Sequence, residues 1–191
     1  RRNLATVRSG EYEGLEEKLS DINWKPDFGP AKYTKKTKNT GVTAISARDF
    51  LVAYNINLNS TSTRRANAIA FDIREAGRVK REGNPITGKK VIDKNGEPER
   101  IPGKLKAVKG IGWFIEEYGI AQISYNLTNI SITSMHEAFY ETTIAATKRG
   151  LRVTGSELVG LVPLRAMLDA ADFYLKKQQR SLGISEREKI K

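Results

Sequence analysis

The chain has 191 residues and a mass of 21.3 kDa, enough for one well-buried domain with a tail or for two very small domains. It contains no cysteine and a single histidine, which excludes disulfides and thiolate metal sites and leaves zinc almost no ligands. Its 33 Lys and Arg against 22 Asp and Glu give a net charge of +11, which suits nucleic acid, a polyanionic cofactor or plain solubility. No apolar run approaches the roughly 20 residues of a membrane span and no signal-peptide pattern is present, so we expect no membrane partner and a cytoplasmic location.

The first fifty residues alternate short helical and loop signals. Residues 2–20 predict a broken helical segment, because apolar residues recur four apart among charged ones. A loop rich in Pro, Gly and Lys is expected over 24–41. A short extra strand is expected over 42–47.

Beyond residue 50 the order of elements is regular. The predicted elements are a strand over 51–58, a helix over about 62–75, strands over 105–113 and 120–127, a helix over 134–149, a strand over 151–156 and a helix over 164–177. This order is the split βαβ pattern, so the predicted fold class is α+β: a ferredoxin-like βαββαβ sandwich with an extra N-terminal strand and a C-terminal helix. An insertion over 78–106 carries its own hairpin signal around Asn95 and Gly96.

Amide side chains recur on one face of the two strands expected at the centre of the sheet. Alternation places apolar residues on the face that meets the helices and leaves Asn55, Asn57, Gln122 and Asn126 on the other. The last strand is expected to add Arg152, Thr154 and Ser156 to that second face. An antiparallel sheet often leaves one face polar, but amides are depleted in strands, so a ligand site, a subdomain interface and a solvated face all stay open.

Five segments together resemble glutamate formimidoyltransferase, the folate-dependent transferase of histidine breakdown. They are GEYEGL (Gly10 to Leu15), PDFGP (Pro26 to Pro30), ARDFLVAYNINLN (Ala47 to Asn59), KGIGWFIEEYGIAQISYNLTN (Lys109 to Asn129) and TGSELVGLVPLRAMLDAADFY (Thr154 to Tyr174). The resemblance implies an enzyme that moves the formimidoyl group from N-formimidoyl-L-glutamate to tetrahydrofolate, and that assembles as a homo-oligomer. It also implies that the catalytic histidine belongs to an N-terminal subdomain that is almost wholly absent here.

The resemblance also implies a division of the chain. Residues 1–22 would be the terminal helix of the missing N-terminal subdomain, 23–41 a folate-binding linker loop, 42–180 the C-terminal formiminotransferase subdomain and 181–191 a charged tail. This fragment would supply folate binding and be inactive alone. The missing subdomain is therefore an expected partner.

The linker loop is the second candidate site. By the resemblance, Gly29, Pro30 and Gly41 match the ends of the family's folate-binding loop. The residues inside it that suit a folate are Lys32, Lys35 and Lys36, as point charges for the carboxylates of a polyglutamated tail, and Tyr33, as a stacking surface. A solvated lysine run is the alternative. The amide face would hold the rest of the folate through paired donors and acceptors.

Three further interpretations complete the sequence-based picture. His136 follows a helix cap and is expected to be structural rather than a general base. A basic ferredoxin-like RNA-binding module is the competing function, but alternation puts Tyr54 and Tyr125 on the helix side, so we expect no nucleic-acid partner. Gly110, Gly112, Gly155 and Gly160 indicate close backbone packing rather than a phosphate cradle.

Overall fold

A computed structural model describes residues 4–85 and 87–178 of the chain. The chain divides into two compact units, residues 1–48 and residues 49–191. The beginning of the first predicted helix and the charged tail predicted over 181–191 lie outside the described residues.

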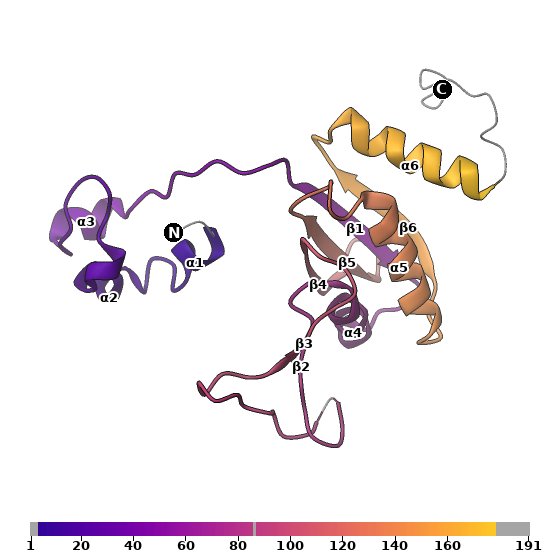
Figure 1. Cartoon of the computed structure of the whole chain (residues 1–191), viewed down its shortest axis with the longest axis horizontal. Coiled ribbons are helices and arrows are strands. Elements are labelled where there is room, and N and C mark those ends of the chain that lie inside the picture. Colours follow the sequence, from indigo (N-terminus) through magenta and orange to yellow (C-terminus); the bar gives the residue numbers. More distant parts are fainter. Residues whose placement is uncertain (1–3, 86, 179–191) are drawn as a thin grey trace. The chain divides into compact units, whose positions relative to one another are not determined.

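The first unit consists of short helices. They are α1 (Leu4–Arg8), α2 (Leu15–Ser20), the 3-10 turn η1 (Ile22–Trp24) and α3 (Lys35–Thr40) (Figure 1). The predicted break in the first helical segment is confirmed. The expected loop over 24–41 is wrong for the six residues of α3, because Thr34 and Thr37 cap each other's backbone N–H groups and begin a helix there.

The second unit is an antiparallel sheet with helices, and the predicted α+β ferredoxin-like fold is confirmed. Its strands are β1 (Val52–Leu58), β4 (Val108–Ile115), β5 (Ile120–Leu127) and β6 (Val153–Val159), in the spatial order β4-β5-β1-β6. Its helices are α4 (Thr63–Ile73), α5 (Met135–Thr147) and α6 (Leu164–Lys177) (Figure 1). The sequence predicts each of these seven elements to within a few residues.

The extra strand predicted over 42–47 is absent. Residues 41–51 have no regular secondary structure, and the side chains of Val42 and Ile45 are 51% and 92% exposed. The segment is rich in apolar and β-branched residues, but a strand forms only where a partner supplies hydrogen bonds, and none of the described strands pairs with it.

The core lies on one face of the sheet, as the alternation predicts. The side chains of β1 and β5 on this face are buried against α4 and α5, and they are Val52, Tyr54, Ile56, Leu58, Ala121, Ile123, Tyr125 and Leu127. Helix α6 packs on α5 through Phe173, whose ring stacks on His136 with centroids 4.6 Å apart. The helices therefore cover this face and leave the amide residues on the other.

Helix α4 also binds the outer edge of β4. Asn67 Nδ2 donates to the carbonyl of Gly112, and the N–H of Gly112 donates to Asn67 Oδ1, both at 3.0 Å. A Cβ atom on Gly112 would lie 2.4 Å from the backbone nitrogen of Asn67, and one on Gly110 would lie 2.6 Å from the Tyr125 ring. The prediction of close packing is confirmed for these two glycines. It is wrong for Gly155 and Gly160, where an added Cβ atom would meet nothing closer than 4.0 Å.

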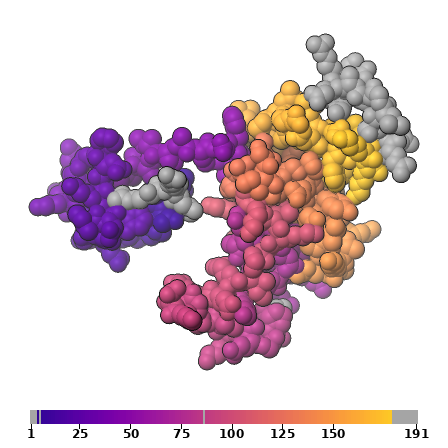
Figure 2. Space-filling model, viewed as in Figure 1, coloured from indigo at the N-terminus to yellow at the C-terminus, as the bar shows by residue number. Residues whose placement is uncertain are grey.

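The insertion over 78–106 forms the predicted hairpin. The N–H of Asp93 donates to the carbonyl of Glu97, and the N–H of Glu99 donates to that of Val91, on either side of the turn at Asn95 and Gly96. Its base is the short pair β2 (Arg78–Val79) and β3 (Arg100–Ile101). Figure 2 shows the insertion as a lobe that projects from the rest of its unit.

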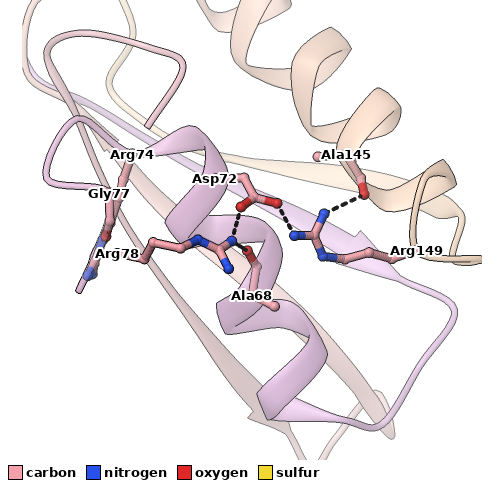
Figure 3. A network of polar contacts seen from close by, with 7 residues as sticks. All are labelled: Ala68, Asp72, Arg74, Gly77, Arg78, Ala145 and Arg149. Atoms are coloured by element: carbon pink, nitrogen blue, oxygen red, sulfur yellow. Dashed lines mark hydrogen bonds and ion pairs between the residues drawn. The ribbon is translucent and has the colours of Figure 1, made fainter. Parts of the chain in front are cut away.

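An ion-pair clamp joins the base of this insertion to both core helices (Figure 3). Asp72, on α4, pairs with Arg78 through one carboxylate oxygen and with Arg149 through the other. Arg78 also donates to the carbonyl of Ala68 at 3.0 Å, and Arg149 to that of Ala145 at 3.3 Å. Burial lowers the pKa of both guanidinium groups, and the nearby Arg149 lowers the pKa of Arg78 further. The carboxylate of Asp72 lies between the two cations and offsets their repulsion.

Candidate functional site

The face of the sheet opposite the helices carries a row of polar side chains that crosses all four strands. From one edge to the other these residues are Trp113 on β4, Gln122 on β5, Asn57 and Asn55 on β1, and Glu157 on β6. The surface around the row is open, since Ile111 is 58% exposed, Trp113 47% and Val159 47%. The middle of the row is packed, because Asn55 is 7% exposed and Gln122 is fully buried.

Hydrogen bonds connect these five side chains into one relay. Trp113 Nε1 donates to Gln122 Oε1 at 3.0 Å. Gln122 Nε2 donates to Asn57 Oδ1 at 2.7 Å and to Glu157 Oε2 at 3.3 Å. Asn55 Nδ2 donates to the same Glu157 oxygen at 3.0 Å.

The chemistry of the two ends fixes the direction of the whole relay. An indole nitrogen can only donate, so Gln122 must turn its oxygen to Trp113 and its NH2 group to Asn57 and Glu157. A carboxylate can only accept, so Asn55 must turn its NH2 group to Glu157. The orientation of each of the three amides follows from these contacts.

Three polar groups of the relay have no hydrogen-bond partner among the described residues. Within the residues that the structure describes, no hydrogen bond uses Asn57 Nδ2, Asn55 Oδ1 or Glu157 Oε1. None of them is among the completely buried unpaired atoms of the described residues, which are His136 Nδ1 and the Tyr174 hydroxyl oxygen. The face therefore offers one donor group beside two acceptors.

The structure brings together most of the residues predicted on this face. Asn55, Asn57 and Gln122 belong to the relay, while Asn126 lies farther along β5, opposite Ala53, and is exposed. Their face is confirmed, and their role in binding stays a prediction.

The expectation that Arg152, Thr154 and Ser156 join the same face is wrong for Ser156. A register shift at Asn57 and Leu58 displaces β6, so that Ser156 pairs with the core residue Ile56, and Gly155 and Glu157 take the outward positions instead. Thr154 falls at the irregularity, and Arg152 precedes the strand.

Sequence reasoning missed Trp113 and Glu157. Trp113 could have been found, because alternation from Lys109 along the glycine-rich strand places residue 113 outward. Glu157 could not, because its side of the sheet depends on a one-residue shift that the sequence does not reveal.

The second candidate site lies in the first unit, and its binding role stays a prediction. A hollow of about 170 Å³ is lined by Pro30, Lys36 and Gly41 together with apolar side chains and two threonines. Gly29 and Gly41 have φ angles of 83° and 65°, which favour glycine. Lys32 and Lys35 are exposed, and Tyr33 is half-buried. Helix α3 thus places Lys35 and Lys36 in its first turn rather than in a loop.

His136 does not belong to the amide face. Its ring stacks on Phe173 between α5 and α6, and its Nε2 lies 3.0 Å from Ser134 Oγ. Burial lowers its pKa, although Asp169 and Glu137 act in the opposite direction. A structural position fits this environment.

The structure also bears on the other interpretations. Tyr54 and Tyr125 are buried on the helix side, where they cannot stack on RNA bases. Among the described residues, no group of three or more His, Cys, Asp or Glu side chains could hold a metal ion. Nor is any helix in the described part both long and apolar enough to span a bilayer.

A four-stranded antiparallel sheet with helices on one face and an oriented polar relay on the other defines an α+β domain of the ferredoxin-like class. Comparison with known proteins identifies its family. The formiminotransferase domain matches residues 53–191, and the N-terminal subdomain of that domain matches residues 1–48. The chain belongs to the formiminotransferase family.

Several curated relatives are similar over nearly all of this chain. It is 46% identical over 178 residues to a formimidoyltransferase-cyclodeaminase of Dictyostelium discoideum, covering 93% of this chain and 29% of the relative. It is 44% identical over 191 residues to the protein of that name from Gallus gallus, covering 100% and 31%. It is 36% identical over 176 residues to a glutamate formimidoyltransferase of Streptococcus pyogenes serotype M1, covering 92% and 50%. The chain thus spans half or less of the length of these relatives.

Proposed function

We propose that this chain is the folate-aligning part of a glutamate formimidoyltransferase, which transfers the formimidoyl group of N-formimidoyl-L-glutamate to tetrahydrofolate in histidine degradation. Family membership carries the proposal, since the relatives are named for formimidoyl transfer. The cytoplasm and a homo-oligomeric assembly are part of the same proposal. We also propose that a further part of the N-terminal subdomain is the partner that completes the folate cleft.

The relay on the sheet face supports a role in alignment. Holding two substrates in a reactive arrangement can lower a barrier by roughly 7–11 kcal/mol, provided that the groups that hold them are rigid. Gln122 is fully buried and makes three hydrogen bonds, which is the kind of support that keeps Asn57 and Glu157 in place. In this proposal Asn55, Asn57 and Gln122 serve the folate, and Asn126 contacts it farther along β5.

The first unit would serve the tail of the cofactor. Lys32, Lys35 and Lys36 are exposed cations without acidic partners among the described ion pairs, which suits the carboxylates of a polyglutamated tetrahydrofolate. Tyr33 would stack, and Gly29, Pro30 and Gly41 would shape the backbone around it.

Chemistry at the formimidoyl carbon needs a base, and the described side chains of the sheet face include no histidine to act as one. The single histidine of the chain lies between two helices on the other side of the sheet. We therefore expect the chain alone to bind substrate without turnover.

A transfer assay tests both statements. The complete product of the gene is incubated with N-formimidoyl-L-glutamate and tetrahydrofolate, and 5-formimidoyl-tetrahydrofolate is measured beside the same assay on the 191-residue chain. We expect transfer by the complete product only. No transfer by the complete product would overturn the proposed function, and robust transfer by the chain alone would overturn its restriction to alignment.

A further inference from the structure

Glu157 is the one acidic side chain in the relay, and it has no cationic partner among the described residues. None of the described ion pairs involves Glu157, and its neighbours in the relay are neutral amides. A half-buried carboxylate that is only partly solvated is costly unless N–H donors satisfy its oxygens. Two donors already occupy Oε2, and Oε1 bonds to no protein group within the described part of the chain.

Asn55, the neighbour of Glu157, also presents a hydrogen-bond acceptor. Asn55 lies directly opposite Glu157 across β1 and β6, and its NH2 group is committed to the carboxylate, so its carbonyl oxygen is left free. Two directly paired residues of β1 and β6 thus each have an acceptor oxygen without a partner among the described residues. A ligand that matches them must bring two donors on one edge.

We propose that Glu157 Oε1 and Asn55 Oδ1 together bind an N–C–N edge that carries two N–H donors, and that Glu157 determines specificity for this edge. The inference depends on the proposed function, because both of its substrates contain such an edge. In N-formimidoyl-L-glutamate it is the amidine group, and in tetrahydrofolate it is N3–H with the 2-amino group of the pterin. The shared chemistry is a planar pair of N–H donors, which a carboxylate binds more strongly than a neutral acceptor does.

The relay explains why the substitution Glu157→Gln would have a large effect. The NH2 groups of Asn55 and Gln122 need an oxygen at this position, so the introduced amide would turn its own oxygen inward and its NH2 group toward the ligand. An acceptor would become a donor without loss of volume. The variant therefore opposes the N–H edge with another N–H group.

The indole signals of the two tryptophans give a direct readout. Nitrogen-15 NMR of the 191-residue chain resolves Trp113 Nε1–H, which is bonded to the relay, while Trp24 belongs to the other unit and reports on binding there. The ligands titrated are N-formimidoyl-L-glutamate, tetrahydrofolate and N-formyl-L-glutamate, in which an oxygen replaces the second nitrogen of the edge. The variants are Glu157→Gln and, as a matched control, Glu117→Gln, which lies exposed in the turn between β4 and β5.

We expect one of the two substrates to shift the Trp113 signal saturably. That substrate is then the one whose N–C–N edge binds Glu157 and Asn55. Its affinity should fall about 10- to 100-fold in Glu157→Gln, the range expected for hydrogen bonds to a charged group, and stay unchanged in Glu117→Gln. If the amidine is the source, N-formyl-L-glutamate should bind more weakly than N-formimidoyl-L-glutamate.

Several outcomes would overturn the inference. Equal affinities in the wild type and Glu157→Gln would do so, as would the absence of any Trp113 shift with either substrate. The proposed function would survive both results if the complete gene product still transfers the formimidoyl group. If Glu157→Gln does not fold, the titrations of the wild-type chain decide. The inference is wrong if tetrahydrofolate does not shift the Trp113 signal and N-formyl-L-glutamate binds as tightly as N-formimidoyl-L-glutamate.

Discussion

Replacement of Gly112 by alanine tests how closely α4 packs on β4. The added Cβ would lie 2.4 Å from Asn67 N and 2.6 Å from both the carbonyl carbon and the Cβ atom of Ala66. Ordinary contacts between heavy atoms begin at about 3.5 Å, so α4 and β4 would have to separate by about 1 Å. Overpacking costs about 1–3 kcal/mol, and loosening the two Asn67 bonds adds about 1 kcal/mol, so we expect a loss of about 2–4 kcal/mol.

Gly155→Ala is the matched control, because it lies in the same sheet and its Cβ would meet only Asn57 Nδ2, at 4.0 Å. Urea unfolding followed by far-UV circular dichroism and tryptophan fluorescence measures both variants. The midpoint of Gly112→Ala should fall by roughly 1–2 M, while that of Gly155→Ala should change little. Equal midpoints for the two variants would refute the close-packing argument.

Three other substitutions probe the described interactions. Asp72→Asn leaves two half-buried arginines without their shared carboxylate, so the free energy of unfolding should fall by about 1–3 kcal/mol in thermal melts, whereas Glu117→Gln should have no effect. Tyr125→Phe removes the hydroxyl that bonds to Thr142 at 3.0 Å in the core and should cost about 1 kcal/mol, measured by urea unfolding. Burial lowers the pKa of His136 from 6.5, so the folded state binds fewer protons than the unfolded state, and stability should decline as the pH falls below that value. His136→Asn should flatten this decline in urea midpoints measured between about pH 7.5 and pH 5, and an unchanged pH dependence would contradict the assignment.

Much of the second unit could be predicted from the sequence because its signals are local. Two-residue alternation in β1 and β5 sorts the core side chains from the amides, and Ser62 and Ser134 cap α4 and α5 by accepting the expected backbone N–H bonds. These patterns concern residues close in sequence. They do not depend on where the other strands lie.

The errors have a common physical cause, which is dependence on distant partners. Glu157 reaches the relay only because β6 shifts by one residue against β1, and pairing register is decided by the whole sheet. Residues 42–47 have the apolar and β-branched composition of a strand, yet no described strand pairs with them. In the same way, the hydrogen bond from Trp113 to Gln122 joins two strands, and neither residue alone predicts it.

The contacts between β4 and the segment around α4 have a consequence for self-association. Besides both polar backbone groups of Gly112, the carbonyl of Gly110 accepts from Arg74 at 3.1 Å, and that of Val108 accepts from the N–H of Glu75 at 2.9 Å. These outward-facing groups would otherwise be a template for a foreign strand. Because four of these groups are already occupied, this border of the sheet offers less to amyloid-like stacking and strand exchange than an uncovered edge strand would.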